Sequence, residues 1–227
     1  DVYKRQAQRG IFFAQLLDPD IPMSVAAFAE FFDDVDADVM DRAVRSTAHD
    51  TESGLLRVVD DEDGEPRIVV DRARTIELGL LDFSDAEDPR GRALAWIDEH
   101  RSRRVDVYSD PLLETYLLRL GPHHVLWYCW GHHVAFDGYA AMFMMVRVAA
   151  HYTAMTTGTA VPPSTSASMS QIADIDHDYR ASAAFVEARK FWEQRLRPGG
   201  ADAPPPTSLS TASAPAAPVA AVESVEL

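Results

Sequence analysis

The sequence has little of the features that mark several common protein classes. Its single cysteine, Cys129, excludes a disulfide framework and a metal site built from several cysteines. No apolar run approaches the roughly 20 residues of a membrane span, and no positively charged leader precedes the patterned sequence. Lysine and arginine number 21 against 36 acidic residues, a formal charge of −15. This acidic surplus argues against nucleic-acid or anionic-membrane partners, so we expect a cytoplasmic protein that has neither.

The 227 residues suit one large domain or two small ones. Residues 1–160 carry alternating strand-like and helix-like patterns, and residues 161–197 form a Pro/Ser connector followed by a helix. Residues 198–227 are rich in Ala, Pro and Ser and have almost no large apolar side chains, so we expect a flexible tail. Because the first residue is Asp1 and patterned sequence follows at once, we also expect a fragment of a longer chain.

Hydrophobic periodicity predicts the helices and strands. Asp36 stands where a helix N-cap is expected, and Gly121-Pro-His-His joins two apolar strands in the clearest hairpin. Helices are predicted over residues 8–17, 37–49, 85–103, 138–156 and 171–197, and strands over 25–32, 55–60, 67–71, 75–82, 112–120 and 125–130. Helices that alternate with hairpins predict an α/β or α+β fold, with a mixed sheet flanked by helices.

One segment carries most of the chemical information, Trp-Gly-His132-His133-Val-Ala-Phe-Asp137-Gly138-Tyr. Neighbouring side chains on a strand point to opposite faces, so the two histidines are expected to do different work. An imidazole titrates near neutrality and can take a proton from an attacking amine or hydroxyl. Asp137 can accept a hydrogen bond or form an ion pair that shapes the turn, and Gly138 permits close backbone approach.

Two plainer interpretations of these histidines stay open. The pair can be purely structural, as adjacent histidines at a strand end usually are. It can also bind a metal, although His-His-x3-Asp lacks the i, i+4 histidine spacing of a zinc helix, and we expect no metal.

The stretch from His132 to Gly138 matches the HHxxxDG signature of condensation domains of nonribosomal peptide synthetases, which this chain therefore resembles. These domains belong to a larger group of acyltransferases similar to chloramphenicol acetyltransferase. Further segments agree with the family in order and spacing over residues 7 to about 210. They are Ala7–Gln15 with Leu17–Pro19, Leu56–Val59 ahead of Asp63–Pro66, Pro111–Leu113 leading to Arg119–Gly121, Asp178–Arg180, and Lys190–Trp192.

The resemblance implies the N-terminal half of a condensation domain, a chloramphenicol-acetyltransferase-like sub-domain that faces a second one across a tunnel. There an acceptor amine attacks a donor acyl thioester and an amide forms. His133 is then the catalytic histidine, His132 its partner, Asp137 a structural carboxylate and Gly138 a neighbour of the reacting centre. Such a mechanism depends mainly on positioning, with modest help from one base. In half a domain, we expect His133 on an open face or in a shallow cleft.

The resemblance also implies partners. Both substrates ride on the phosphopantetheine arms of carrier domains, so we expect carrier domains, other synthetase modules and a missing C-terminal sub-domain as partners, and no cofactor bound directly. Two other functions stay open: a stand-alone O- or N-acyltransferase that uses coenzyme A or a carrier, and a non-catalytic module that only binds a carrier. Arg101, Arg103 and Arg104 form a basic cluster that could meet an acidic carrier or simply end a solvated helix.

A few residues depart from the family pattern or invite a functional interpretation that we do not favour. The family's second motif commonly has a His-Glu pair, of which this chain keeps only Glu52. We interpret Cys129 as a core residue of its strand and not as a nucleophile. The apolar run Met142, Phe143, Met144 and Met145 is interpreted mainly as core packing of its helix, and the alternative that some of these side chains line the tunnel stays open.

Overall fold

The computed structural model describes residues 6–196. Their helices and strands are, in chain order, α1 Gln6–Leu17, β1 Ser24–Phe31, α2 Ala37–Thr51, the short 3-10 helix η1 Ser53–Leu55, β2 Leu56–Asp60, β3 Pro66–Val70, β4 Leu78–Asp82, α3 Pro89–Arg101, β5 Leu113–Gly121, β6 His124–His132, α4 Gly138–Thr157, α5 Met169–Ala181 and α6 Ala183–Arg195. The chain divides into two compact units between Ala173 and Asp174.

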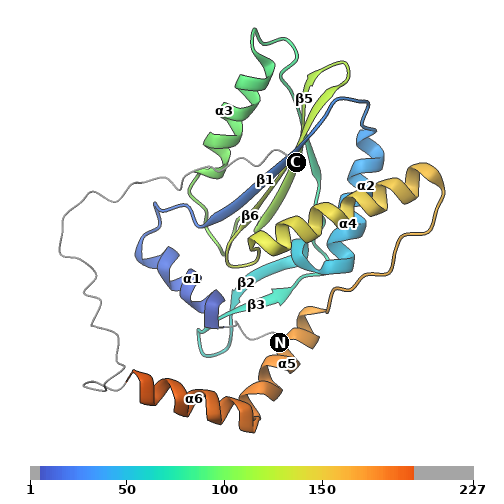
Figure 1. Cartoon of the computed structure of the whole chain (residues 1–227). Coiled ribbons are helices and arrows are strands. Elements are labelled where there is room, and N and C mark those ends of the chain that lie inside the picture. The colour runs from blue at the N-terminus through green and yellow to red at the C-terminus, as the bar shows by residue number, and fades with distance from the viewer. Residues whose placement is uncertain (1–5, 197–227) are drawn as a thin grey trace. The chain divides into compact units, whose positions relative to one another are not determined.

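A four-stranded mixed sheet forms the centre of the first unit (Figure 1). Its strands lie in the order β1-β6-β5-β4, with β6 antiparallel to both β1 and β5 and with β4 parallel to β5. Strands β2 and β3 form a separate antiparallel hairpin. The mixed sheet and its helices confirm the predicted α/β class.

Helices cover both faces of this sheet, α2 and α4 on one side and α3 on the other (Figure 1). The central strand β6 is therefore buried on both faces, which explains its nearly continuous apolar sequence. Side chains alternate along it: Trp127 and Cys129 pack toward α2 and α4, whereas Tyr128 and Trp130 pack toward α3. This strand carries the chain directly into the HHxxxDG segment.

A third apolar cluster lies beside the end of β6. It joins Phe12 of α1 with Leu56 and Val58 of β2, Ile68 of β3 and Val134, the residue that follows the two histidines. All five side chains are at most 2% exposed. Helix α1 and the β2–β3 hairpin are thereby packed against the HHxxxDG segment.

Local sequence signals place several element ends where they were predicted. The Asp36 carboxylate accepts a hydrogen bond from the Val39 N–H at 3.0 Å and so caps α2. The hairpin turn at Gly121-Pro-His-His joins β5 to β6 as expected. Helix α4 ends at Gly158, whose φ of 70° is a conformation that glycine adopts without strain.

Other element ends differ from the prediction for identifiable reasons. The strand predicted from residue 75 starts only at Leu78, the first residue that pairs with β5. Helix α3 starts at Pro89 and not at residue 85, because Asp88 caps it and proline suits the first turn. The helix predicted over 171–197 is two helices, since Ser182 caps the second. The predicted tail over 198–227 lies outside the described residues.

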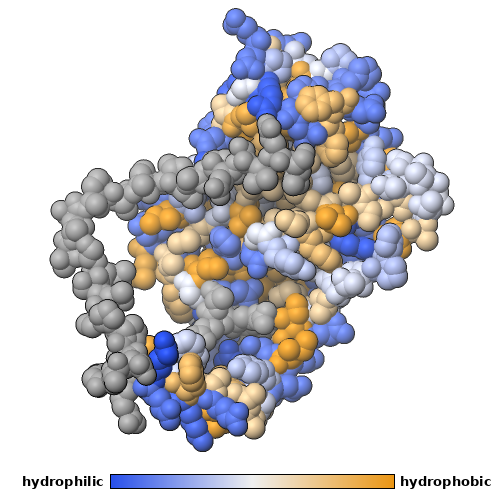
Figure 2. Space-filling model, in the orientation of Figure 1, coloured by the Kyte–Doolittle hydropathy of each residue, from blue (hydrophilic) through white to orange (hydrophobic). Residues whose placement is uncertain are grey.

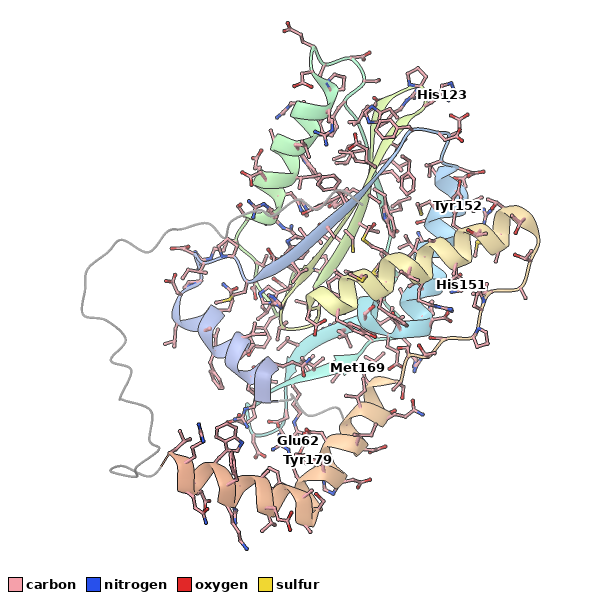
Figure 3. All side chains as sticks on the ribbon, in the orientation of Figure 1. Glu62, His123, His151, Tyr152, Met169 and Tyr179 are labelled. Atoms are coloured by element: carbon pink, nitrogen blue, oxygen red, sulfur yellow. The ribbon has the colours of Figure 1, made fainter. Side chains whose placement is uncertain are left out.

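A partly buried ion cluster fastens α4 to α2. The Asp50 carboxylate of α2 accepts hydrogen bonds from Arg147 at 2.5 Å and from His151 at 2.8 Å, both on α4; His151 is labelled in Figure 3. Burial opposes ionisation of Asp50, but the bonds from Arg147 and His151 outweigh it and lower the pKa of Asp50. Arg147 also donates to the carbonyl of Pro162, so the segment after α4 is held against the same cluster.

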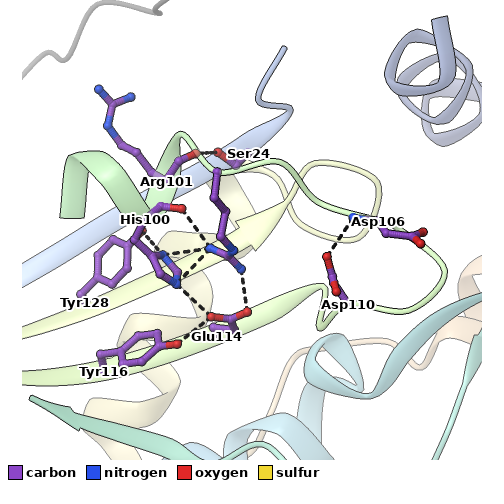
Figure 4. A network of polar contacts seen from close by, with 9 residues as sticks. Ser24, His100, Arg101, Asp106, Asp110, Glu114, Tyr116 and Tyr128 are labelled. Atoms are coloured by element: carbon purple, nitrogen blue, oxygen red, sulfur yellow. Dashed lines mark hydrogen bonds and ion pairs between the residues drawn. The ribbon is translucent and has the colours of Figure 1, made fainter. Parts of the chain in front are cut away.

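The basic cluster of three arginines does not form a free positive surface. Arg101 pairs with Asp98 at 2.5 Å, and Arg104 lies 3.7 Å from Asp20. Arg103 donates to Glu114 at 2.6 Å; Glu114 is labelled in Figure 4. The interpretation of these arginines as a docking patch for an acidic carrier is therefore weakened.

Candidate active site

The HHxxxDG segment forms a tight connection between β6 and α4. Strand β6 continues two residues further than predicted and ends at His132. The His132 carbonyl then accepts hydrogen bonds from the N–H groups of Ala135 and Phe136, at 2.9 and 3.0 Å. Asp137 follows as the N-cap of α4. The two histidines thus sit at the point where a buried strand turns into a helix.

His132 is an interior residue whose two ring nitrogens are both in use. Its side chain is 1% exposed. Its Nδ1 accepts from the Val134 N–H at 3.2 Å, and its Nε2 lies 3.1 Å from the Gln15 Oε1 atom. Burial lowers the pKa of His132 to about 4, and the neighbouring His133 adds to the effect. His132 is therefore neutral at pH 7 and serves as a structural anchor of the segment.

His133 differs from its neighbour in having hydrogen-bonding capacity to spare. It is half-buried, and its backbone N–H donates to the Met23 carbonyl at 2.8 Å. Its Nδ1 is buried and has no hydrogen-bond partner within residues 6–196. This nitrogen is shielded from solvent, so the nitrogen left for a substrate is the Nε2, which is not among the buried unpaired atoms and makes no hydrogen bond within the same residues. Of the two histidines, the geometry favours His133 as the reactive group.

Asp137 and Gly138 shape the start of α4. The Asp137 carboxylate accepts from the Ala140 N–H at 2.8 Å, so the first of its two expected uses, accepting a hydrogen bond, is the one observed. Both residues are exposed, and a Cβ added at Gly138 would meet nothing within 4 Å. The space beside Gly138 is open in this part of the protein.

Two glutamines of α1 hold the segment, and their role was not foreseen from the sequence. The Gln8 Nε2 donates to the Val134 carbonyl at 3.0 Å, and the Gln15 side chain contacts the His132 ring. Both glutamines lie in the stretch that resembles the family's first motif, seven residues apart and so on one face of the helix. That spacing was the available signal, but the contact itself spans 126 residues of sequence for Gln8 and could not be inferred from it.

The glycine before the histidines is expected to be intolerant of a side chain. A Cβ at Gly131 would lie 2.5 Å from a ring carbon of Phe136, which is itself 3% exposed in the core. We expect Gly131→Ala to lower the free energy of unfolding by about 1–3 kcal/mol, as overpacking does. Gly138→Ala is the matched control and is expected to cost nothing, because its space is open. Urea unfolding of both variants checks this; equal stabilities would contradict it.

Stability is expected to fall in mild acid because of His132. An unfolded histidine binds a proton near pH 6.5, whereas the folded His132 does so only near pH 4. Between these values the unfolded state binds more protons, so the free energy of unfolding decreases as pH falls, by about 2 kcal/mol between pH 7 and pH 5. Urea unfolding at both pH values should show this loss in the wild type and a smaller one in His132→Gln. An identical loss in both proteins would contradict the assignment.

Cys129 is the remaining candidate for a nucleophile, and its surroundings do not suit that role. Cys129 is buried, and burial raises the pKa of its thiol to about 12, so it does not serve as a nucleophile at neutral pH. Within residues 6–196 no group of three or more His, Cys, Asp or Glu side chains is arranged to hold a metal ion. None of the described helices has both the length and the apolar character needed to cross a membrane.

Helix α4 shows an apolar outer face directly after the HHxxxDG segment. Met144 is in the core as predicted, but Met142 is 69% exposed, which corrects its interpretation as core packing. Tyr139 and Val146 are exposed as well and lie three or four residues from Met142, on the same side of the helix. Hydrophobic side chains are visible along α4 in Figure 2.

Comparison with known proteins agrees with this geometry. The family model for the condensation domain matches residues 2–215. The chain is 36% identical over 200 residues to an isonitrile lipopeptide synthase of Streptomyces coeruleorubidus, covering 88% of this chain and 13% of that protein. It is 34% identical over 205 residues to a dimodular nonribosomal peptide synthase of Bacillus subtilis (strain 168), covering 90% of this chain and 8% of that protein.

The solved structures that are similar to this chain are also condensation domains. The starter condensation domain of rhizomide synthetase RzmA is similar with a TM-score of 0.81 and 26% identity, covering 87% of this chain and 48% of that one. A variant of that domain in complex with C8-CoA is similar with a TM-score of 0.79 and 27% identity, covering 86% and 45%. The chain thus spans about half of these domains and a small part of the synthetases. With the family model, the motif and the fold in agreement, this chain belongs to the condensation-domain family.

Proposed function

We propose that this chain supplies the histidine-bearing half of a site that joins a carrier-bound acyl or peptidyl thioester to an aminoacyl thioester in nonribosomal peptide synthesis. The observation that carries the proposal is the contrast between the two histidines. His132 is buried and paired through both ring nitrogens, whereas His133 is half-buried with one nitrogen unpaired. A base at the end of a rigid strand is what the proposed reaction needs.

The reaction balances without a metal or a covalent enzyme intermediate. The lone pair of the acceptor amine attacks the donor carbonyl carbon, a C–N bond forms and the C–S bond breaks. The proton that leaves the amine passes to His133 and then to the departing pantetheine sulfur. Because the thioester is already activated, His133 needs to supply only the modest help of one general base.

The donor is proposed to be an acyl group with an aliphatic chain. The exposed side chains of Tyr139, Met142 and Val146 follow the reactive segment and offer an apolar surface to such a chain. Two relatives support the choice, since one is named a lipopeptide synthase and the other is a starter domain seen with C8-CoA. The partners proposed are carrier domains, which deliver both substrates on phosphopantetheine in the cytoplasm, and a second sub-domain that completes the site.

The experiment offers the chain C8-CoA as donor with a leucine thioester or an aliphatic alcohol as acceptor, and detects products by mass spectrometry. Amide from the leucine thioester supports condensation, and ester from the alcohol alone supports the O-acyltransferase alternative. Acetyl-CoA is the matched control donor. It is expected to react more slowly than C8-CoA if the apolar face of α4 binds the aliphatic acyl chain. Carrier binding with neither product would overturn an activity of this chain on its own and would favour a carrier-binding module.

A further inference from the structure

Gln15, His132 and the backbone of two loops form a continuous chain of hydrogen bonds. The Val134 N–H meets the His132 Nδ1 at 3.2 Å, the His132 Nε2 meets the Gln15 Oε1 at 3.1 Å, and the Gln15 Nε2 meets the Pro19 carbonyl at 3.2 Å. The side chains of His132 and Gln15 are 1% and 5% exposed, so water does not compete for these bonds.

The two ends of this series of hydrogen bonds determine the direction of every bond in it. The Val134 N–H can only donate, so the His132 Nδ1 must be unprotonated. A neutral imidazole then carries its proton on Nε2, which donates to the Gln15 oxygen. At the other end the Pro19 carbonyl can only accept, which requires the Gln15 amide nitrogen to face it. Both ends therefore demand the same orientation of Gln15 and the same tautomer of His132.

Both ends of this series of bonds lie near the backbone that holds His133. Pro19 and Met23 belong to the same short connection between α1 and β1. Pro19 is held by Gln15, and the Met23 carbonyl accepts from the His133 N–H at 2.8 Å. On the other side of His133, Val134 is held by the His132 ring through its N–H and by Gln8 through its carbonyl. Gln15 thus bonds both to the ring that holds the Val134 N–H and to the connection that contains Met23.

We propose that Gln15 is a positioning residue that holds His132 as its Nε2–H tautomer and thereby fixes the backbone that presents His133. This inference rests on the proposed function for its catalytic consequence, but not for its structural content. A buried glutamine chosen for packing alone would be served by leucine, which fills similar volume and leaves no polar group to satisfy. The use of both amide atoms of Gln15 favours a role in orientation.

The first test is spectroscopic and needs no turnover. The chain is labelled with nitrogen-15 in its histidines, and the ring signals of His132 are identified by their loss in His132→Gln. We expect the proton of the His132 ring on Nε2 in the wild type. In Gln15→Leu the Nε2 proton has no acceptor, so the ring is expected to turn away from the Val134 N–H and to populate both tautomers. Gln8→Leu is the matched control from the same helix, and it should keep the Nε2 proton. A proton on Nδ1 in the wild type would overturn the inference, even if Gln15→Leu did not fold.

The second test is kinetic. Gln15→Leu is expected to lower kcat on the order of tenfold or more, since small misplacements of a catalytic group are costly, with KM for the acyl donor unchanged. An unchanged kcat would overturn the positioning role. If the wild type made no product, the proposed function would fail while the tautomer measurement still decided the inference about Gln15.

Discussion

Replacement of His133 by alanine is expected to slow amide formation by a factor on the order of 10²–10⁴, the usual contribution of one general acid–base group. The residue is half-buried, and its hydrogen bond to Met23 is made by the backbone N–H, which the substitution keeps. The variant should therefore keep its fold, with a loss in unfolding free energy of about 1 kcal/mol. Initial rates with C8-CoA and a leucine thioester, measured beside the urea unfolding of the same samples, separate the two effects.

His123→Ala is the matched control for this loss. His123 lies at the β5–β6 turn, bonded to Asp34 at 2.8 Å and largely exposed (Figure 3). It is at the opposite end of β6 from the HHxxxDG segment, so its removal is expected to leave the rate unchanged. A rate in His133→Ala that equals that of His123→Ala would contradict a catalytic role for His133.

The largest loss of stability is expected at Glu114, in the network under α3 (Figure 4). Its carboxylate accepts from Arg103 at 2.6 Å and from the Tyr116 hydroxyl at 2.8 Å, and it lies 2.9 Å from the His100 Nε2. The Arg103 guanidinium also lies 3.9 Å from the centre of the Trp130 ring. Glu114→Ala leaves Arg103 and His100 without this carboxylate, and we expect a loss of about 3 kcal/mol.

The pH dependence of this network has a definite sign. Burial opposes the charge on Glu114, but hydrogen bonds from His100 and Tyr116 and the charge of Arg103 outweigh it and lower the pKa of Glu114. Its stabilising contribution is therefore complete above about pH 4.5 and is lost as pH falls through the lowered value.

At pH 7, urea unfolding should give a lower free energy of unfolding for Glu114→Ala than for Glu114→Gln. The exposed Glu62→Ala is the control, and a Glu114→Ala loss no larger than that of Glu62→Ala would contradict the account.

Local chemistry made much of this fold predictable. Asp36 caps its helix as expected, and the apolar run of β6 is long enough to identify a buried strand from its residues. The HHxxxDG segment is evident from its residue types and spacing. Strand alternation correctly suggested separate environments for His132 and His133, although His133 lies in the turn after β6. These features depend on neighbours within a few residues, which is why the sequence reveals them.

What the sequence could not supply depends on contacts between distant segments. Gln15 meets His132 across 117 residues, and nothing in the α1 sequence alone indicates that partner. Arg103 was grouped with its basic neighbours but turns to Glu114 on a strand eleven residues away. In each case the charged or polar group is paired with a partner that only the packing of the fold brings within reach.

The central claim is that His133 stands where the reacting carbonyl arrives, and an affinity label tests it most directly. Bromoacetyl-pantetheine resembles a pantetheine-linked acyl group, and an imidazole nitrogen can displace its bromide to form a stable bond. After brief exposure of the folded chain, peptide mapping by mass spectrometry locates the label. The account predicts alkylation of His133, with His132 untouched and with no label at this site in His133→Ala. Labelling of His132, or of exposed histidines such as His123 to the exclusion of His133, would contradict it.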